Sequence, residues 1–89
     1  MDKFEVILAP KALKFYKKSA KELVERLDQC FQELESNPFF GSDIKILKTQ
    51  DRLYRYRVGG YRVIYEINKN DKKVGVLIIA PRPSVYRNI

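Results

Sequence analysis

The spacing of hydrophobic and polar residues changes near the middle of the chain. From Pro10 to about Ser36, apolar residues recur at intervals of three and four, which is typical of one face of a helix. This stripe consists of Leu23, Leu27, Cys30, Phe31 and Leu34. Residues 17–20 mark a joint and Asn37-Pro38 is a stop signal, so we expect two helices. The stripe could bind a partner, but we favour core packing because a sheet needs such a cover.

Outside this region the apolar residues alternate with polar ones, which is the period of a β-strand. The expected strands are residues 4–8, 44–48, 53–58, 61–67 and 74–80. Gly59-Gly60 separates two alternating runs and predicts a two-residue hairpin turn, because both positions can then adopt φ > 0. We therefore expect a single α+β domain over residues 1–89, in the order β-α-α-β-β-β-β. Its antiparallel sheet is a four-stranded meander plus the N-terminal strand, covered on one face by the two helices.

The predicted hairpin has two chemically different sides. If Val58 and Tyr61 flank the turn, the side that we expect the helices to cover is aromatic and β-branched. It carries Tyr54, Tyr56, Val58, Tyr61, Val63 and Tyr65. The other side carries Leu53, Arg55, Arg57, Arg62, Ile64 and Glu66. Arg57 opposite Arg62 is a repulsive pair, which is either tolerated by solvated side chains on an exposed face or used to hold an anion.

The charge of the chain strengthens the second reading. The 89 residues have a net charge of +7. Residues 1–43 carry 7 basic and 8 acidic side chains, whereas residues 44–89 carry 11 and 3, so the second half has a net charge of +8. Six of the seven arginines lie there. Arginine presents a rigid fork of donors that fits phosphate, so this surface suits a nucleic-acid backbone.

Several absences narrow the function further. The chain contains no histidine, the commonest metal ligand and general base, and we expect no metal and no other cofactor. The longest apolar run, residues 76–80, is far shorter than the roughly 20 residues that span a membrane. No apolar leader follows Met1. The one cysteine, Cys30, cannot form an internal disulfide and is expected to pack as a small hydrophobe. A cytoplasmic location is therefore expected.

Two segments of the second half carry the motifs of a known family. The run LYRYRVGGYRVIYEI at 53–67 and the tail PRPSVYR at 81–87 resemble the RelE/ParE superfamily of type II toxin–antitoxin toxins, and its RelE branch most. The likeness covers nearly the whole chain. It implies a metal-independent endoribonuclease, an mRNA interferase that cleaves mRNA in the ribosomal A site and so inhibits translation. It also implies a small acidic RelB-like antitoxin that wraps around the toxin.

The same resemblance implies roles for individual residues. Arg62 matches the phosphate-binding arginine of the family, Arg82 its second active-site arginine, and Tyr86 the tyrosine that contacts the cleaved nucleotide. Arg55 and Arg57 stand where RelE enzymes often have lysines, and they complete the expected catalytic set. The further basic residues expected to contact RNA are Lys45, Lys48, Arg52 and Arg87.

The sequence offers more than one candidate for the general base and more than one function. Arginine is a poor base because its pKa lies above about 12, and Pro81 stands where many family members carry a histidine. Lys48, Lys45 and Glu66 are the candidates for the base. The alternative functions are a ParE-like inhibitor of DNA gyrase and a non-catalytic RNA-binding module.

An antitoxin partner is also expected on physical grounds. A +8 half and exposed sheet edges favour an acidic, partly disordered chain that folds on binding. Phe39 and Phe40 are expected to close the end of the core, with docking of the antitoxin as the alternative.

Overall fold

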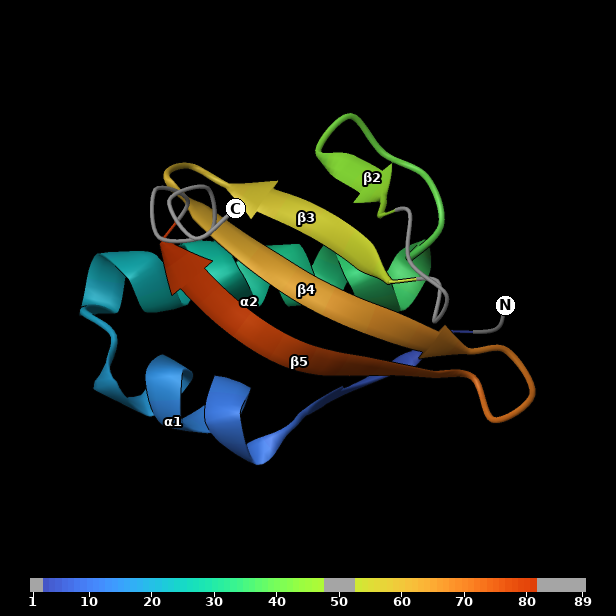
Figure 1. Cartoon of the computed structure of the whole chain (residues 1–89), viewed down its shortest axis with the longest axis horizontal. Coiled ribbons are helices and arrows are strands. Elements are labelled where there is room, and N and C mark those ends of the chain that lie inside the picture. Colours follow the sequence, from blue (N-terminus) through green and yellow to red (C-terminus); the bar gives the residue numbers. More distant parts are fainter. Residues whose placement is uncertain (1–2, 48–52, 82–89) are drawn as a thin grey trace.

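The structure of the protein, a computed structural model, describes residues 3–47 and 53–81. Within these ranges it contains two helices and a five-stranded sheet (Figure 1). The elements are β1 (Glu5–Leu8), α1 (Pro10–Lys18), α2 (Lys21–Ser36), β2 (Ile44–Ile46), β3 (Tyr54–Val58), β4 (Tyr61–Asn68) and β5 (Lys73–Pro81). The predicted α+β class and element order are confirmed. No helix in the described part of the chain is long and apolar enough to cross a membrane.

The limits of the two helices follow from local signals. Pro10 opens α1 at a position where its missing N–H removes no hydrogen bond. Ser19 ends that helix with extended backbone, and its hydroxyl donates to the Phe15 carbonyl at 2.7 Å. Asn37 ends α2, also with extended backbone. Its side-chain oxygen accepts the N–H groups of Phe39 and Phe40 at 3.0 and 3.3 Å, which fixes the loop that follows.

The strands are arranged in the order β1-β5-β4-β3-β2. Strands β2 to β5 form the predicted antiparallel meander. β1 pairs with β5 in the parallel direction. A parallel pair requires a long connection, and here it runs through both helices and three strands. The sheet is therefore mixed. β2 ends at Ile46 and β3 begins at Tyr54, so both are shorter than expected, and Lys48 lies outside the described residues.

The hairpin of β3 and β4 has the predicted register. Arg57 lies opposite Arg62, and Val58 and Tyr61 flank the turn. Gly59 has a φ of 56° and is the described glycine with a positive φ, so the turn uses this freedom at its first position. A Cβ on Gly59 would lie 2.9 Å from Nη1 of Arg26 in α2. The backbone conformation therefore favours glycine at this position, and a side chain here would also displace the end of Arg26.

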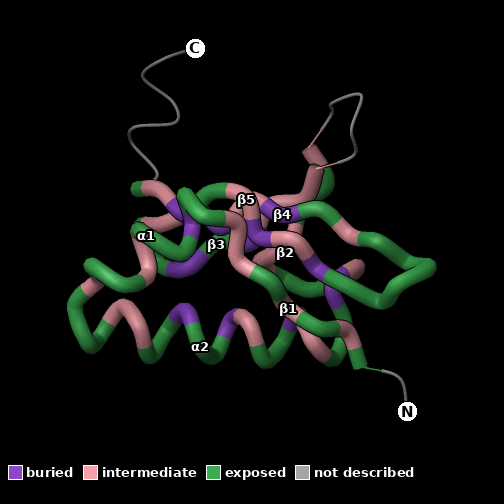
Figure 2. Tube along the Cα trace, turned by 90° about the horizontal axis from the view of Figure 1, so that it is seen from below, coloured by how far each residue is buried: buried purple, intermediate pink, exposed green. Residues whose placement is uncertain are grey.

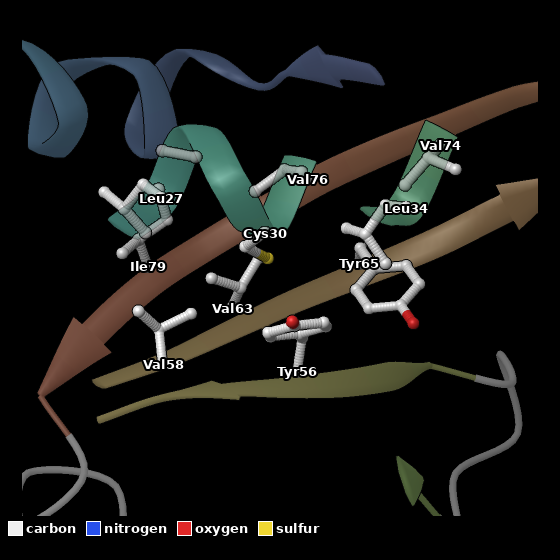
Figure 3. Packing of buried hydrophobic residues seen from close by; sticks show 11 residues of the cluster. Leu27, Cys30, Leu34, Tyr56, Val58, Val63, Tyr65, Val74, Val76 and Ile79 are labelled. Carbon is white, nitrogen blue, oxygen red and sulfur yellow. The ribbon is translucent and has the colours of Figure 1, made fainter. Parts of the chain in front are cut away.

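The core lies between the helices and one face of the sheet. Figure 2 shows α2 running along the sheet with its buried positions turned toward the strands. The buried hydrophobic residues are Ala12, Leu27, Cys30, Leu34, Tyr56, Val58, Val63, Tyr65, Val74, Val76 and Ile79. Figure 3 shows the α2 residues of this group facing those of β3, β4 and β5. The apolar stripe of the second helix thus packs in the core, as predicted.

The two phenylalanines after α2 have different environments. Phe39 packs edge-on against Phe4 and Tyr54, with ring centroids 5.7 and 6.4 Å apart, and so closes the end of the core as expected. Phe40 is 78% exposed, so the expectation that it also closes the core is wrong. Its ring lies beside that of Phe39, with centroids 6.5 Å apart, and both rings line a surface hollow of about 510 Å³.

Candidate nucleic-acid interface

Four cationic side chains share the sheet face that the helices leave open. Lys45 of β2 lies opposite Arg55 of β3, and Arg57 of β3 lies opposite Arg62 of β4. Arg55 and Arg57 are two residues apart in one strand and therefore point to the same side. We call Lys45, Arg55, Arg57 and Arg62 the cationic face. Directly opposite side chains have Cβ atoms about 4.5–5.5 Å apart, so three strands bring these charges within reach of one bound anion.

Arg62 occupies the most enclosed position of the cationic face. It is 7% exposed and is the one buried charged residue in the described part of the chain. Its neighbours across the strands are Arg57 and Ala80. Burying a charge is costly, and the sheet holds this one beside a second positive charge. The guanidinium of Arg62 is therefore held in place within the face, in contrast to the mobile charges of a solvated surface.

Arg55 has a donor that the fold leaves without a partner. Its Nε atom is buried and makes no hydrogen bond to the residues that the structure describes. The side chain stands between Lys45 on one neighbouring strand and Ile64 on the other. An unsatisfied buried donor costs about 1–3 kcal/mol, which an anion bound on the face would recover. A phosphate has the charge and the acceptor oxygens for this position.

Arg57 is the open member of the face and has an acidic neighbour. Its Nη2 lies 3.7 Å from Oδ1 of Asp43, and the two side chains are 50% and 40% exposed. Its backbone N–H also donates to the Asp43 carbonyl at 2.9 Å. Sequence reasoning missed Asp43. The available signal was its place directly before β2: once Ile44 pairs with Tyr56, the preceding residue comes beside Arg57.

The sequence reasoning also missed Arg26, the one arginine of the first half. It belongs to α2, and its Nη1 reaches the hairpin turn at Gly59. Arg26 and Arg57 both line a hollow of about 280 Å³ between α2 and β3. A helix residue thus extends the positive charge around the end of the hairpin. No strand pattern could have indicated this, because the contact depends on how α2 packs on the sheet.

The three candidates for a general base have different positions. Lys45 lies directly opposite Arg55 and belongs to the cationic face. Glu66 is on the same side of β4, but it is exposed and lies over Gly75, where a Cβ would be 3.4 Å from its Cγ. It is four residues from Arg62, roughly 13 Å along the strand. Lys48 lies outside the described residues. Of the two described candidates, Lys45 is the one that stands beside the arginines.

The remaining predicted site residues lie outside the described residues. They are Arg52, Arg82, Tyr86 and Arg87. The last described residue before the tail is Pro81, which pairs with Tyr61, the neighbour of Arg62.

The tyrosines of β3 and β4 belong to the opposite face and are occupied there. The Tyr56 hydroxyl donates to Oε1 of Glu33 at 2.5 Å, and the Tyr65 hydroxyl donates to the Pro38 carbonyl at 2.8 Å. Burial is the main cause that raises the pKa of both phenols above the ordinary value of 10.0. Burial likewise raises the pKa of the Cys30 thiol. These groups therefore belong to the core, and burial disfavours the thiolate form that a nucleophilic cysteine needs.

The cationic face can hold a phosphodiester and stabilise negative charge on it. Three guanidinium groups offer directed donors, and Lys45 adds a fourth positive charge beside Arg55. In the described part of the chain, no group of three or more Cys, Asp or Glu side chains comes together that could hold a metal ion.

Both the sequence and the fold of the chain match known proteins. Residues 6–86 match the family model described as "ParE toxin of type II toxin-antitoxin system, parDE". The curated protein "Putative toxin RelE1" of Methanocaldococcus jannaschii is 31% identical over 88 residues, which are 97% of this chain and 98% of that protein. A chain of the archaeal RelE-RelB complex from Pyrococcus horikoshii OT3 superposes with a TM-score of 0.79 at 32% identity, over 90% of this chain and 96% of that one. A chain of the RelB-RelE complex from Methanococcus jannaschii has the same fold, with a TM-score of 0.73 at 24% identity, over 93% and 98% of the two chains.

Proposed function

The chain belongs to the ParE/RelE family of toxins from type II toxin–antitoxin systems, and from this premise we propose that it is an endoribonuclease of the RelE type. In this proposal it cleaves mRNA in the ribosomal A site and so inhibits translation in the cytoplasm. The observation that carries the proposal is the cationic face: Arg62 is buried there and Nε of Arg55 has no partner among the described residues. Arginines that only kept the protein soluble would be hydrated instead.

RNA supplies its own nucleophile, so the protein needs few reactive groups. The 2′-hydroxyl attacks the adjacent phosphorus and displaces the 5′-oxygen of the next nucleotide, which leaves a 2′,3′-cyclic phosphate and a 5′-hydroxyl. Negative charge builds on the equatorial oxygens during this displacement. Arg55, Arg57 and Arg62 lie on one face, where they can bind those oxygens and stabilise that charge. Removing one such donor typically costs about 10²–10³ in rate.

Proton transfer is assigned to the residues beside the arginines. Lys45 is our candidate for the base, because it lies directly opposite Arg55. As the free amine it accepts the proton of the 2′-hydroxyl, and the ammonium that results returns this proton to the leaving 5′-oxygen. Lys48 stays a second candidate. Arg82 and Tyr86 complete the proposed site on the strength of the resemblance, with Tyr86 contacting the cleaved nucleotide. Arg52 and Arg87 are proposed to contact the RNA backbone.

The proposed partner is a RelB-like antitoxin. The solved relatives from Pyrococcus horikoshii and Methanococcus jannaschii are toxin–antitoxin complexes. An acidic antitoxin would also lower the electrostatic repulsion within a chain of net charge +7.

The decisive experiment is primer extension on translated mRNA with the double variant Arg62→Ala/Arg82→Ala. The wild-type toxin should cut within codons of translated messages and leave an untranslatable copy of the same message intact. The double variant should lose this cutting. Its matched control, Lys17→Ala/Lys69→Ala, removes the same charge from exposed positions off the cationic face and should still cut. Cutting by the Arg62→Ala/Arg82→Ala variant at the wild-type rate would exclude the assigned site.

One observation favours a second candidate function. The matching family model is described as the ParE toxin, so inhibition of DNA gyrase is the alternative. A supercoiling assay separates the two, because an mRNA interferase should leave gyrase-dependent supercoiling unchanged. Binding to programmed ribosomes without any cleavage product would instead indicate a non-catalytic RNA-binding module.

A further inference from the structure

An apolar groove lies on the helix side of the molecule, away from the cationic face. It has a volume of about 590 Å³ and runs between α1, the start of α2 and the first residue of β4. Its floor consists of Phe15, Leu23 and Tyr61, and its rim includes Lys11, Lys14 and Lys18. We call this hollow the α1 groove.

The floor of the α1 groove offers apolar surface and few polar groups. Phe15 and Tyr61 contact each other edge-on, with ring centroids 6.0 Å apart and an interplanar angle of 65°. The one hydroxyl of the joint between the helices, on Ser19, donates to the Phe15 carbonyl within the chain. An occupant therefore has to contribute apolar side chains.

The rim has one sign of charge. Lys11, Lys14 and Lys18 are three and four residues apart, so they lie along one side of α1. This helix contains no acidic residue, and within the described ranges none of the three lysines forms an ion pair. Residues 1–43 are nearly neutral in sum because α1 is basic whereas most of the acidic residues lie in α2. An occupant therefore has to carry carboxylates beside its apolar side chains.

We propose that the α1 groove binds an acidic amphipathic segment of the antitoxin. This inference rests on the proposed function for the existence of the antitoxin. Apolar side chains of the segment fill the space above Phe15, Leu23 and Tyr61, while its carboxylates reach the three lysines. RNA fits less well, because bases stack on open ring faces and these two rings are half-buried and packed edge-on against each other.

The α1 groove and the cationic face lie on different sides of β4, so one can be occupied while the other is free. Tyr61 points to the helix side of β4, whereas the next residue, Arg62, belongs to the cationic face. A segment in the α1 groove would therefore hold the toxin without using the arginines. Antitoxin affinity should depend on α1 and should survive substitution of the exposed Arg57.

The test compares two lysines of the same helix. Lys14→Glu changes the rim, whereas Lys17→Glu makes the same charge reversal on an exposed residue that does not line the groove. The probe is the purified product of the reading frame adjacent to the toxin gene, titrated by calorimetry into each toxin variant. Lys14→Glu should bind it about tenfold more weakly, and Lys17→Glu should stay within about twofold of wild type.

A second variant tests the apolar part without changing charge. Ala20 is exposed, lines the groove and caps α2 through its backbone alone. Ala20→Trp should fill the hollow and weaken binding as well, while circular dichroism confirms that the variant is folded. Photo-crosslinking from a benzoyl-phenylalanine at position 20, but not at position 17, should trap the antitoxin.

The remaining outcomes overturn the inference in distinguishable ways. Equal losses for Lys14→Glu and Lys17→Glu would mean that only net charge matters. Unchanged antitoxin affinity together with weaker ribosome binding by Lys14→Glu would make the groove an RNA contact. A shift of the free toxin between monomer and dimer with Lys14→Glu, and no change in antitoxin affinity, would make the occupant a second copy. Cleavage by the wild-type toxin is measured separately, so a failed nuclease assay with a selective loss at Lys14 would reject the proposed function and leave the groove standing.

Discussion

The two faces of the sheet differ in whether their polar groups have hydrogen-bond partners within the described residues. On the helix-covered face, the hydroxyls of Tyr56 and Tyr65 each donate to a fixed acceptor within the chain. On the open face, Nε of Arg55 is buried without a partner among the described residues, and Arg57 lies opposite Arg62. Residues that are adjacent in sequence thus belong to different environments. The tyrosine hydroxyls of the covered face have their acceptors within the chain, whereas the open face has a buried donor that we propose an anion satisfies.

Neighbouring residues of one strand are therefore expected to affect different properties, stability on the covered face and RNA binding on the open face. Tyr56 and Arg57 are neighbours, yet one is buried in the core and the other has a half-exposed side chain. Substitutions on the covered face should therefore alter the free energy of unfolding. Substitutions of the exposed cations should alter binding to RNA and leave stability nearly unchanged.

Tyr65→Ala should destabilise the protein more than any other substitution considered for the two faces. Tyr65 is fully buried and its hydroxyl holds the Pro38 carbonyl, so the variant leaves a cavity and a buried acceptor without its donor. The free energy of unfolding should fall by about 3–5 kcal/mol, measured by urea denaturation. Tyr65→Phe keeps the ring and should cost about 1–3 kcal/mol. Arg57→Ala should stay within about 0.5 kcal/mol; an equal loss there would break the distinction between the faces.

Much of this division could be predicted from the sequence, because it rests on local rules. Gly59-Gly60 fixes the turn, the turn fixes the register of β3 and β4, and the register assigns each side chain to a face. The apolar stripe of α2 then identifies which face is covered. The strand order of β2 to β5 follows from short connections between antiparallel neighbours.

The missed features depend on contacts between distant segments. The alternation of polar and apolar residues assigns Arg62 to a face of the sheet. It does not predict how far Arg62 is buried, because burial depends on segments that are distant in the sequence. The pair of Asp43 and Arg57 requires the register of β2, which no tight turn sets. Arg26 reaches Gly59 because of the position of α2 on the sheet. The parallel pairing of β1 with β5 likewise joins segments more than 60 residues apart in the chain.

Alkaline pH should lower the free energy of unfolding through the buried tyrosines of the covered face. The fold raises the pKa of Tyr56 and Tyr65 above 10.0, mainly through burial. The folded state therefore favours the protonated phenols, and this contribution to stability is complete below pH 10 and is lost as the pH rises further. Unfolding followed by circular dichroism should coincide with tyrosinate absorbance. A Tyr56→Phe variant should resist alkali better at matched stability. Ionisation near pH 10 without unfolding would mean that the phenols are accessible.

The open face should determine the salt dependence of RNA binding. Arg57→Ala removes one proposed phosphate contact, so the slope of log affinity against log salt for single-stranded RNA should become shallower by about 0.7. Fluorescence anisotropy at several salt concentrations measures this slope. Tyr56→Phe, the neighbouring residue on the other face, is the matched control and should leave the slope unchanged. Equal slopes for Arg57→Ala and wild type would remove Arg57 from the RNA contacts.

A weaker change is expected at the edge of the open face, where Asp43 lies beside Arg57. In the proposed RNA complex Asp43 would compete with a phosphate for Arg57, since its Oδ1 lies 3.7 Å from Nη2 of the guanidinium. Asp43→Asn keeps the size of the side chain and the backbone hydrogen bond between the two residues but removes the competing charge. Because both side chains are partly exposed, the gain should be at most about 1 kcal/mol, roughly fivefold tighter RNA binding at low salt, and it should shrink as salt screens the pair.

Asp71→Asn is the matched control for this variant, because Asp71 lies in the β4–β5 turn, where its Oδ2 accepts the Asn68 amide, at the other end of β4 from Arg62. A similar gain from both variants would mean that only net charge matters. Weaker binding by Asp43→Asn would show that the carboxylate orients Arg57 for RNA, so that even this exposed cation has its position set by the fold. In that case the feature that still distinguishes the open face is Nε of Arg55, which is buried and has no partner among residues 3–47 and 53–81.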